Sequence, residues 1–267
     1  MLRVIWKAIK YAALGVLALF TLWIVYEVVT FPRFTQLKTK DPETTSMIET
    51  RLREARDEGR EPRRVQHWVP LSRISPHLQR AILAGEDTNF VTHNGFDYQA
   101  IQRAWEEGQK VAEKEAKEEG DTDEQGWIPD LSHFKRGAST ITQQLAKNLY
   151  LSSERSFARK GREAFLTYFL ERTLPKRRIL EIYLNVIEWG DGVYGAEAAA
   201  QTYFNKPAAA LNAREAAFLA AMIPNPRTVF NPVPTAQNPK SNLKRVQRRQ
   251  RAILRGMPHV RLPPGAG

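Results

Sequence analysis

EDTNFVTHNG, at residues 86–95, and GASTITQQLAKN, at residues 137–148, are two dense polar stretches, each at the edge of a helical segment. The second places Ser, Thr, Gln, Lys and Asn between Ile141, Leu145 and Leu149, which are spaced as on one face of a helix. A fully buried segment would need a partner for each polar group, and a disordered linker would not keep the apolar spacing. The pattern predicts a helix with one apolar face and one donor-rich face, suited to a polar or anionic ligand.

Length and composition set broad limits. The 267 residues, of which 42% are hydrophobic, allow one globular domain plus an appendage. The absence of cysteine excludes disulfides and thiolate metal sites. A net charge of +11 favours anionic partners, which include nucleic acid, a membrane surface and a phosphorylated substrate. Charge alone does not choose among these three.

Residues 11–31 form an almost wholly apolar run in which Glu27 is the one charged residue, and basic residues precede it within 1–10. Roughly 20 residues suffice to cross a hydrocarbon layer of about 30 Å as a helix. A cleaved signal peptide is the alternative, but the run exceeds the roughly 7–15 apolar residues of a typical signal sequence, and no A-x-A site follows. We expect a single-pass transmembrane anchor with residues 1–10 in the cytoplasm and the rest of the chain outside it.

The remaining sequence predicts a mainly helical fold. Ser75 and Pro76 supply an N-cap and a proline at the first helical position, and the helix that they open delivers Glu86 at its C-terminal end. Residues 32–67 are predicted to be a stalk or first helix, and the charged residues 106–124 a solvated helix or loop. Further helices are predicted from a Ser139 cap to Tyr150, over 154–173, after Pro175, from a capping box at 212–215, and over 240–256.

Five segments, in this order, resemble the peptidoglycan glycosyltransferases of glycosyltransferase family 51. They are residues 86–95, residues 137–148, R-K-x-x-E at 159–163, K-x-x-I-L-E-x-Y-L-N at 176–185, and R-E with A-A-M-I-P-N-P within 214–226. The resemblance implies a lysozyme-like, two-lobed helical domain over residues 68–230. A basic C-terminal helix and tail at 231–267 would follow it.

The resemblance also implies an activity and a location. Family members polymerise lipid II into linear β-1,4 glycan strands of peptidoglycan and release undecaprenyl pyrophosphate. The chain would act at the bacterial inner membrane, with its catalytic domain on the periplasmic side. Its partners would be lipid II, the growing glycan, the membrane, and cell-wall synthesis or division proteins, with no nucleic acid.

Residue roles follow from the resemblance. A sugar hydroxyl is a poor nucleophile, so a carboxylate must remove its proton; Glu86 would be this general base in an inverting displacement. Glu163 would be the second catalytic glutamate, either as a direct acid or as an organiser of the leaving group. The substrate-binding residues would be Asp87, Ser139, Gln143, Gln144, Lys147, Arg155 and Arg159, with Lys147 and Arg155 on the diphosphate. No dedicated cofactor site is expected, although Mg²⁺ or Mn²⁺ at the pyrophosphate is compatible with the pattern.

Several residues keep two interpretations. Arg159 and Glu163, four apart on a helix, also fit a surface ion pair. His93 fits either catalysis or a hydrogen bond within its loop. The spacing from Gly95 to Gly137 is long for the family, and its apolar residues at 127–134 could enter the bilayer or pack under a loop. The basic residues of the C-terminal helix would meet anionic lipid or face solvent, namely Lys244, Arg245, Arg248, Arg249 and Arg251.

Two other functions compete with polymerisation. A lytic, lysozyme-like enzyme would cleave glycan strands with one glutamate but would need no diphosphate site, so Lys147 and Arg155 favour synthesis. An idle scaffold is disfavoured because both glutamates are present. The Ser-x-x-Lys patterns at 132–135 and 241–244 lack an accompanying Lys-Thr-Gly, so no transpeptidase activity is expected.

Overall fold

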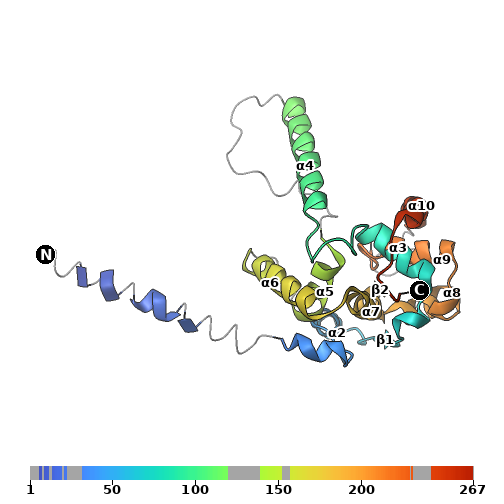
Figure 1. The fold of residues 1–267 in the computed structure, drawn as a ribbon, viewed down its shortest axis with the longest axis horizontal. Coiled ribbons are helices and arrows are strands. Elements are labelled where there is room, and N and C mark those ends of the chain that lie inside the picture. The colour runs from blue at the N-terminus through green and yellow to red at the C-terminus, as the bar shows by residue number, and fades with distance from the viewer. Residues whose placement is uncertain are drawn as a thin grey trace.

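Most of the chain beyond residue 31 is placed in the computed structural model (Figure 1). The described residues are 6–7, 9–11, 14–19, 21–22, 32–119, 139–151, 157–228, 230 and 242–266. None of the helices that these residues form combines the length and the apolar character needed to cross a membrane. The other residues of the predicted anchor, at 12–13, 20 and 23–31, lie outside the described residues.

The described part of the chain is mainly helical, as the sequence predicts. Its α-helices, in chain order, are α2 (Ser46–Asp57), α3 (Pro76–Glu86), α4 (Tyr98–Glu119), α5 (Ile141–Tyr150), α6 (Phe157–Thr173), α7 (Lys176–Val186), α8 (Ala196–Phe204), α9 (Ala213–Met222) and α10 (Leu243–Gly256). Short 3-10 helices are η1 (Phe34–Lys38), η2 (Leu71–Arg73), η4 (Ala208–Ala210) and η5 (Met257–His259).

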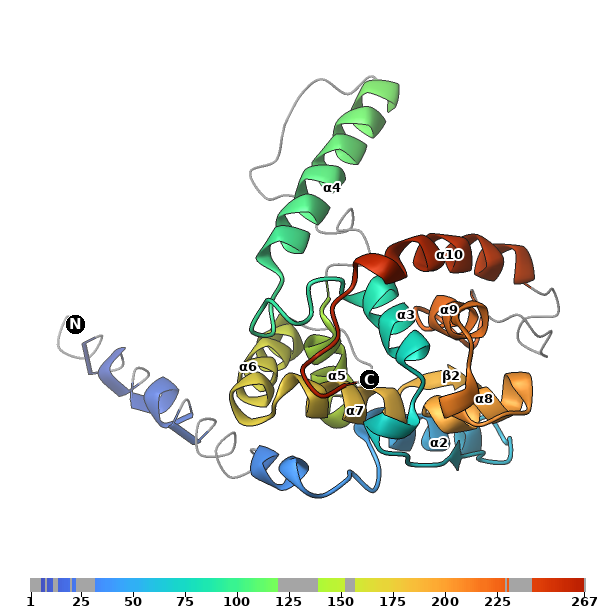
Figure 2. The same cartoon turned by 45° about the vertical axis from the view of Figure 1, so that its right-hand side comes forward.

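Helix α3 lies at the centre of one group of helices, packed against α9 and α10 (Figure 2). Its start is the predicted one, because the Ser75 side chain accepts a hydrogen bond from the backbone N–H of His77 and Pro76 follows. Leu78, Ile82 and Leu83 are fully buried on its inner face. This packing fixes the direction of the helix and hence the position of Glu86 at its last turn.

A second group of helices surrounds α5, which packs against α2, α6 and α7. The apolar residues that the sequence places on one face of α5, Ile141, Leu145 and Leu149, are all buried. Helix α2 therefore belongs to the folded body, although residues 32–67 are predicted as a stalk or first helix. Thr45 caps α2 by accepting a hydrogen bond from the N–H of Ile48.

A small sheet lies beside these helices and is too short to show strand periodicity in the sequence. Its strands are β1 (Val65–Gln66), β2 (Glu188–Gly190) and β3 (Val193–Tyr194), in the order β1-β3-β2. Strand β3 pairs parallel to β1 and antiparallel to β2. The turn between β2 and β3 is tight: Gly192 has φ +70°, and a Cβ there would lie 2.7 Å from the backbone oxygen of Arg63.

Helix α4 projects from the body in both views (Figures 1 and 2). It covers much of the charged stretch at 106–124, for which the sequence left a solvated helix or a loop open. Glu106 and Glu107 are exposed, in keeping with a solvated helix. The apolar residues predicted at 127–134 lie outside the described residues.

Candidate active site

Glu86 is held in place by two side chains from distant parts of the sequence. It lies at the C-terminal end of α3, and only 9% of its side chain is exposed. Its Oε1 accepts a hydrogen bond from Nη2 of Arg249 at 2.8 Å, and its Oε2 accepts one from Nε2 of Gln144 at 2.9 Å. The carboxylate is thus buried, paired and fixed in direction.

The orientation of the Gln144 amide is itself fixed by a third residue. The hydroxyl of Tyr183, on α7, donates to Oε1 of Gln144 at 2.8 Å. Because Oε1 accepts this bond, Nε2 is the atom that faces Glu86 and donates to it. The segments at 137–148 and 176–185 therefore meet at one carboxylate.

Burial and nearby charges act against each other at Glu86. Burial raises the pKa of this carboxyl group, whereas Arg249, the hydrogen bond from Gln144, and Lys147 lower it, and the net result is a raised pKa. A carboxylate of this kind is more basic than one in water. It suits removal of a proton from a hydroxyl group.

Lys147 lies on α5 close enough to interact electrostatically with both Glu86 and Glu163. Its side chain is partly buried, and burial lowers the pKa of its ammonium, with Arg159 and Lys160 lowering it further. Among the described residues, no hydrogen bond or ion pair engages this ammonium group. It is a cation available to an anionic ligand.

Glu163 is not part of an exposed ion pair, so the surface interpretation of the Arg159–Glu163 spacing is wrong. Only 4% of its side chain is exposed, and its Oε2 accepts a hydrogen bond from Nη1 of Arg159 at 3.3 Å. Its Oε1 accepts one from the ammonium of Lys160. Burying a carboxylate is costly without such partners, and here the partners are two cations of α6.

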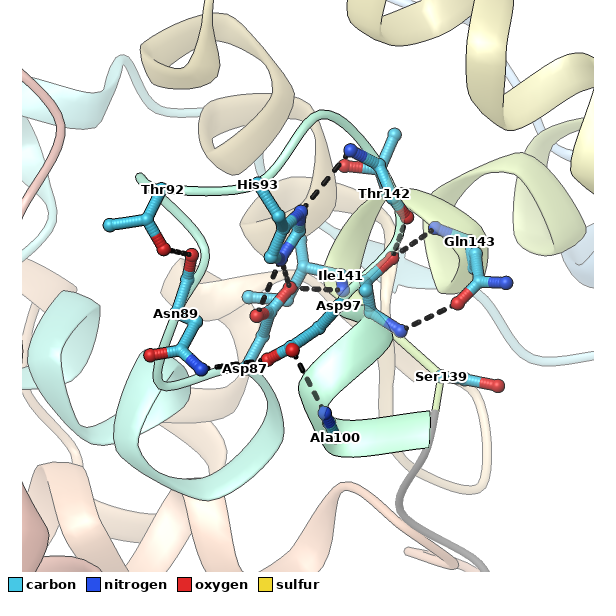
Figure 3. Close-up of polar contacts among 12 residues, drawn as sticks. Asp87, Asn89, Thr92, His93, Asp97, Ala100, Ser139, Ile141, Thr142 and Gln143 are labelled. Atoms are coloured by element: carbon cyan, nitrogen blue, oxygen red, sulfur yellow. Dashed lines mark hydrogen bonds and ion pairs between the residues drawn. The ribbon is translucent and has the colours of Figure 1, made fainter. Parts of the chain in front are cut away.

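The loop after Glu86 is closed by a hydrogen-bond network around Asp87 (Figure 3). The N–H of Gly95 donates to Nδ1 of His93, so Nε2 carries the proton and donates to Asp87 at 2.9 Å. The N–H of Ile141 donates to the other oxygen of Asp87 at 2.9 Å. Both ring nitrogens of His93 serve the loop, which favours its structural interpretation over a catalytic one.

The start of α5 corrects the predicted cap by one residue. Thr140, not Ser139, is the N-cap: its hydroxyl accepts from the N–H of Gln143, and Oε1 of Gln143 accepts from the N–H of Thr140 at 2.9 Å. Gln143 is thus buried and bonded within the protein. Thr140 and Gln143 thus form a capping box in which Ser139 takes no part. The side chain of Ser139 points away from the Asp87–His93 network in Figure 3.

A cavity of about 210 Å³ opens beside Glu86. It is bounded by the end of α3, the loop that follows, the first turns of α4 and the residues before α5. Hydroxyl, amide and charged groups dominate its wall, as suits a sugar. The lining residues are Ala84, Gly85, Glu86, Asp87, Thr88, Asn89, Asp97, Ala100, Arg103, Ser139 and Thr140.

The structure brings together Glu86, Gln144 and Lys147, and it places Arg159 with Glu163 beside Lys147. Asp87 and Gln143 are also predicted to bind substrate. In the structure Oδ1 of Asp87 accepts a hydrogen bond from His93, and Oε1 of Gln143 accepts one from the N–H of Thr140. Arg155 lies outside the described residues. Within the described ranges, no group of three or more His, Asp or Glu side chains could hold a metal ion.

Arg249 and Tyr183 are site residues that the sequence interpretation missed. The basic side chains of the C-terminal helix were expected to meet lipid or solvent, which is wrong for Arg249 because it pairs with Glu86. A signal exists in the spacing: Val246 and Ile253 are buried, and Arg249 lies three residues after the first and four before the second. These positions share one helix face.

Comparison with known proteins identifies the family of this chain. The sequence matches the model of the transglycosylase family over residues 53–122 and 126–258. The chain belongs to the transglycosylase family. A biosynthetic peptidoglycan transglycosylase of Thiobacillus denitrificans is 44% identical over 230 residues, which cover 86% of this chain and 89% of that protein.

Two further relatives of this chain are also described as biosynthetic peptidoglycan transglycosylases. The one from Bordetella pertussis is 45% identical over 212 residues, covering 79% of this chain and 81% of the relative. The one from Azoarcus sp. is 43% identical over 227 residues, which cover 85% of this chain and 88% of the relative. The similarity therefore extends over most of each protein, and the family match covers the segments that form the Glu86 site.

Proposed function

We propose that this transglycosylase is a peptidoglycan glycosyltransferase that polymerises lipid II into linear β-1,4 glycan strands and releases undecaprenyl pyrophosphate. The family and the names of the relatives support the enzyme class. The observation that carries the proposal is the buried, oriented carboxylate of Glu86 beside Lys147, whose ammonium has no partner among the described residues. The base Glu86 and the cation Lys147 lie next to each other, as a reaction with a pyrophosphate leaving group requires.

Glu86 acts in this proposal as the general base. The 4-hydroxyl of the acceptor sugar would enter the cavity, and Glu86 would take its proton as the oxygen attacks the donor carbon. Gln144 and Tyr183 support this role because they aim the carboxylate. A single displacement inverts the α-linked donor to a β-linked product, and no covalent glycosyl-enzyme forms.

Lys147 and Arg159, with Arg155 from its place in the sequence pattern, would hold the diphosphate as the glycosidic bond breaks. Cations placed where negative charge develops stabilise the transition state directly. Glu163 already has two cationic partners and interacts electrostatically with Lys147. We therefore assign Glu163 as the organiser of this cation cluster rather than as a proton donor.

A divalent cation at the pyrophosphate would take most of its ligands from the phosphate oxygens. This follows because the described residues offer no ready cluster of protein ligands, and Glu163 is already paired. Gln144 and Ser139 complete the proposed substrate contacts, and Asp87 and Gln143 shape the loop and helix that carry them. The body would be the two-lobed, lysozyme-like domain of the family.

The proposed location follows from the substrate. Lipid II is confined to the membrane, and peptidoglycan is built outside the cytoplasm. Residues 11–31 would anchor the chain in the inner membrane, and the Glu86 site would lie on the periplasmic side. The apolar run and the basic residues that precede it support this placement.

The test is incubation of the purified protein with labelled lipid II, followed by separation of polymer from monomer. The proposal expects labelled glycan strands that muramidase digests to disaccharide units. Preformed strands offered to the same protein should remain intact. Cleavage of those strands without polymer formation would instead identify a lytic enzyme.

A further inference from the structure

Helix α10 delivers Arg249 to the last turn of α3 through close packing. Gly85 and Gly256 allow this approach: a Cβ at Gly85 would lie 3.1 Å from Cδ1 of Ile253, and one at Gly256 would lie 3.4 Å from Cβ of Ala84. Nη2 of Arg249 donates both to the backbone oxygen of Gly85 at 2.9 Å and to Oε1 of Glu86 at 2.8 Å. The guanidinium thus binds the helix end and the carboxylate together.

We propose that Arg249 is a positioning residue of the reaction, which keeps the buried Glu86 carboxylate ionised and fixed while substrate is bound. The proposal rests on the proposed role of Glu86 as general base. It assigns a function to helix α10, which lies within the family match but carries none of the five segments from which the sequence analysis inferred the site residues.

Asp97 and Arg103 line the same cavity as Glu86. Among the described residues, the charged and titratable groups that interact with the Glu86 carboxylate come from three helices and its own loop. They are Arg249 from α10, Lys147 from α5, Tyr183 from α7, and Asp87 next in the chain. Tyr183 and Asp87 bring no positive charge to the site. Within the described part of the chain, Arg249 and Lys147 are therefore the two cations that lower the pKa of Glu86 and favour its ionised form.

The two cations differ in what else engages them. Lys147 has no partner within the described residues and is the proposed ligand of the diphosphate, so its charge is shared with substrate during the reaction. Arg249 is already bonded to Glu86 and to Gly85. Once substrate is bound, Arg249 remains the counter-ion of the base.

Pairing with Arg249 leaves Glu86 able to work as a base. A carboxylate offers about four lone-pair positions, and Arg249 and Gln144 each take one, on different oxygens. Without Arg249, burial would favour the protonated acid. The fraction of ionised Glu86 would then fall at any given pH, and most strongly in acid.

The experiment compares pH–rate profiles for lipid II polymerisation by the wild type, Arg249→Met and Arg249→Lys. The exposed Arg251 on the same helix provides the control Arg251→Met. Arg249→Met should lose roughly tenfold or more of the wild-type rate near pH 6 and recover most of it as the pH rises. Arg249→Lys should lose less, and Arg251→Met should follow the wild type.

A second measurement keeps the inference separate from activity. The carboxyl ¹³C signal of Glu86, assigned by its loss in Glu86→Gln, should titrate at higher pH in Arg249→Met than in the wild type. A uniform rate loss across pH with an unmoved titration would overturn the proposal and make Arg249 a substrate or packing residue. If Arg249→Met fails to fold, an unmoved titration together with a uniform rate loss in Arg249→Lys would overturn it. Failure of the proposed function would appear differently, as a wild type inactive at every pH.

Discussion

The hydroxyl of Tyr183 lies 2.8 Å from Oε1 of Gln144 and donates a hydrogen bond to it. This contact, together with a 3.4 Å hydrogen bond from Nε2 of Gln144 to the backbone oxygen of Ser139, sets which end of the Gln144 amide faces Glu86. Tyr183 is fully buried and is not one of the described residues that line the cavity beside Glu86. A residue outside the cavity wall therefore helps to orient the Glu86 carboxylate through Gln144.

Tyr183→Phe should slow polymerisation by roughly tenfold, because the Gln144 amide can then turn its oxygen toward the Glu86 carboxylate. Stability should fall by about 1–2 kcal/mol from the unpaired amide oxygen. The matched control is Tyr203→Phe, which removes a hydroxyl bonded to the backbone oxygen of Trp189. The control should lose stability without the kinetic defect, and equal rates in both variants would contradict the positioning role.

The pH dependence of polymerisation should be bell-shaped. Glu86 must be ionised, so the rate falls as the pH drops through its pKa, which burial raises above the usual 4.5. Lys147 must be charged, so the rate also falls as the pH rises through its pKa, which burial lowers below the usual 10.5. Lys147→Arg should move the alkaline limb upward, because a guanidinium stays protonated.

Replacement of Lys147 by Met tests the same residue without its charge. Polymerisation should fall by about 10²-fold or more, since a cation at the diphosphate is lost. The unfolding midpoint should change little because the ammonium has no partner within the described residues. A large drop in the midpoint would indicate that Lys147 is structural.

Gly95→Ala should disturb the loop that follows Glu86. Gly95 has φ +90°, and a Cβ there would lie 2.8 Å from Cγ2 of Thr167 and 3.0 Å from Cγ of Glu171. We expect a loss of about 1–3 kcal/mol in stability and a reduced rate, measured by thermal unfolding and lipid II turnover. Gly161→Ala is the control: it lies in α6 with open space at its Cβ, so it should be neutral or slightly stabilising.

Local patterns account for what the sequence predicted well. Ser75 and Pro76 open α3 because capping depends on adjacent residues, and the apolar face of α5 follows from helical spacing. The cap at Thr140 was also within reach of the sequence. Gln143 follows Thr140 by three residues, which completes a capping box that Ser139 cannot form.

Contacts between distant segments account for what was missed. Arg249 and Glu86 are 163 residues apart. Helix periodicity places Arg249 on the buried face of α10, but it does not show that this face packs against α3. Gln143 and Gln144 are neighbours on one helix, and whereas the bond of Gln143 to Thr140 is local, only a tertiary contact brings Gln144 to Glu86. The strands of the small sheet are two or three residues long, too short for an alternating pattern.

The role of Glu86 as general base is tested most directly by the polymerisation rate of Glu86→Gln with labelled lipid II, measured beside the wild type. The amide keeps the size of the side chain and can still accept from Arg249, but it cannot take up the hydroxyl proton. We predict a rate lower by about 10²- to 10⁴-fold in a protein that remains folded. Polymerisation by this variant at a rate near that of the wild type would contradict the account.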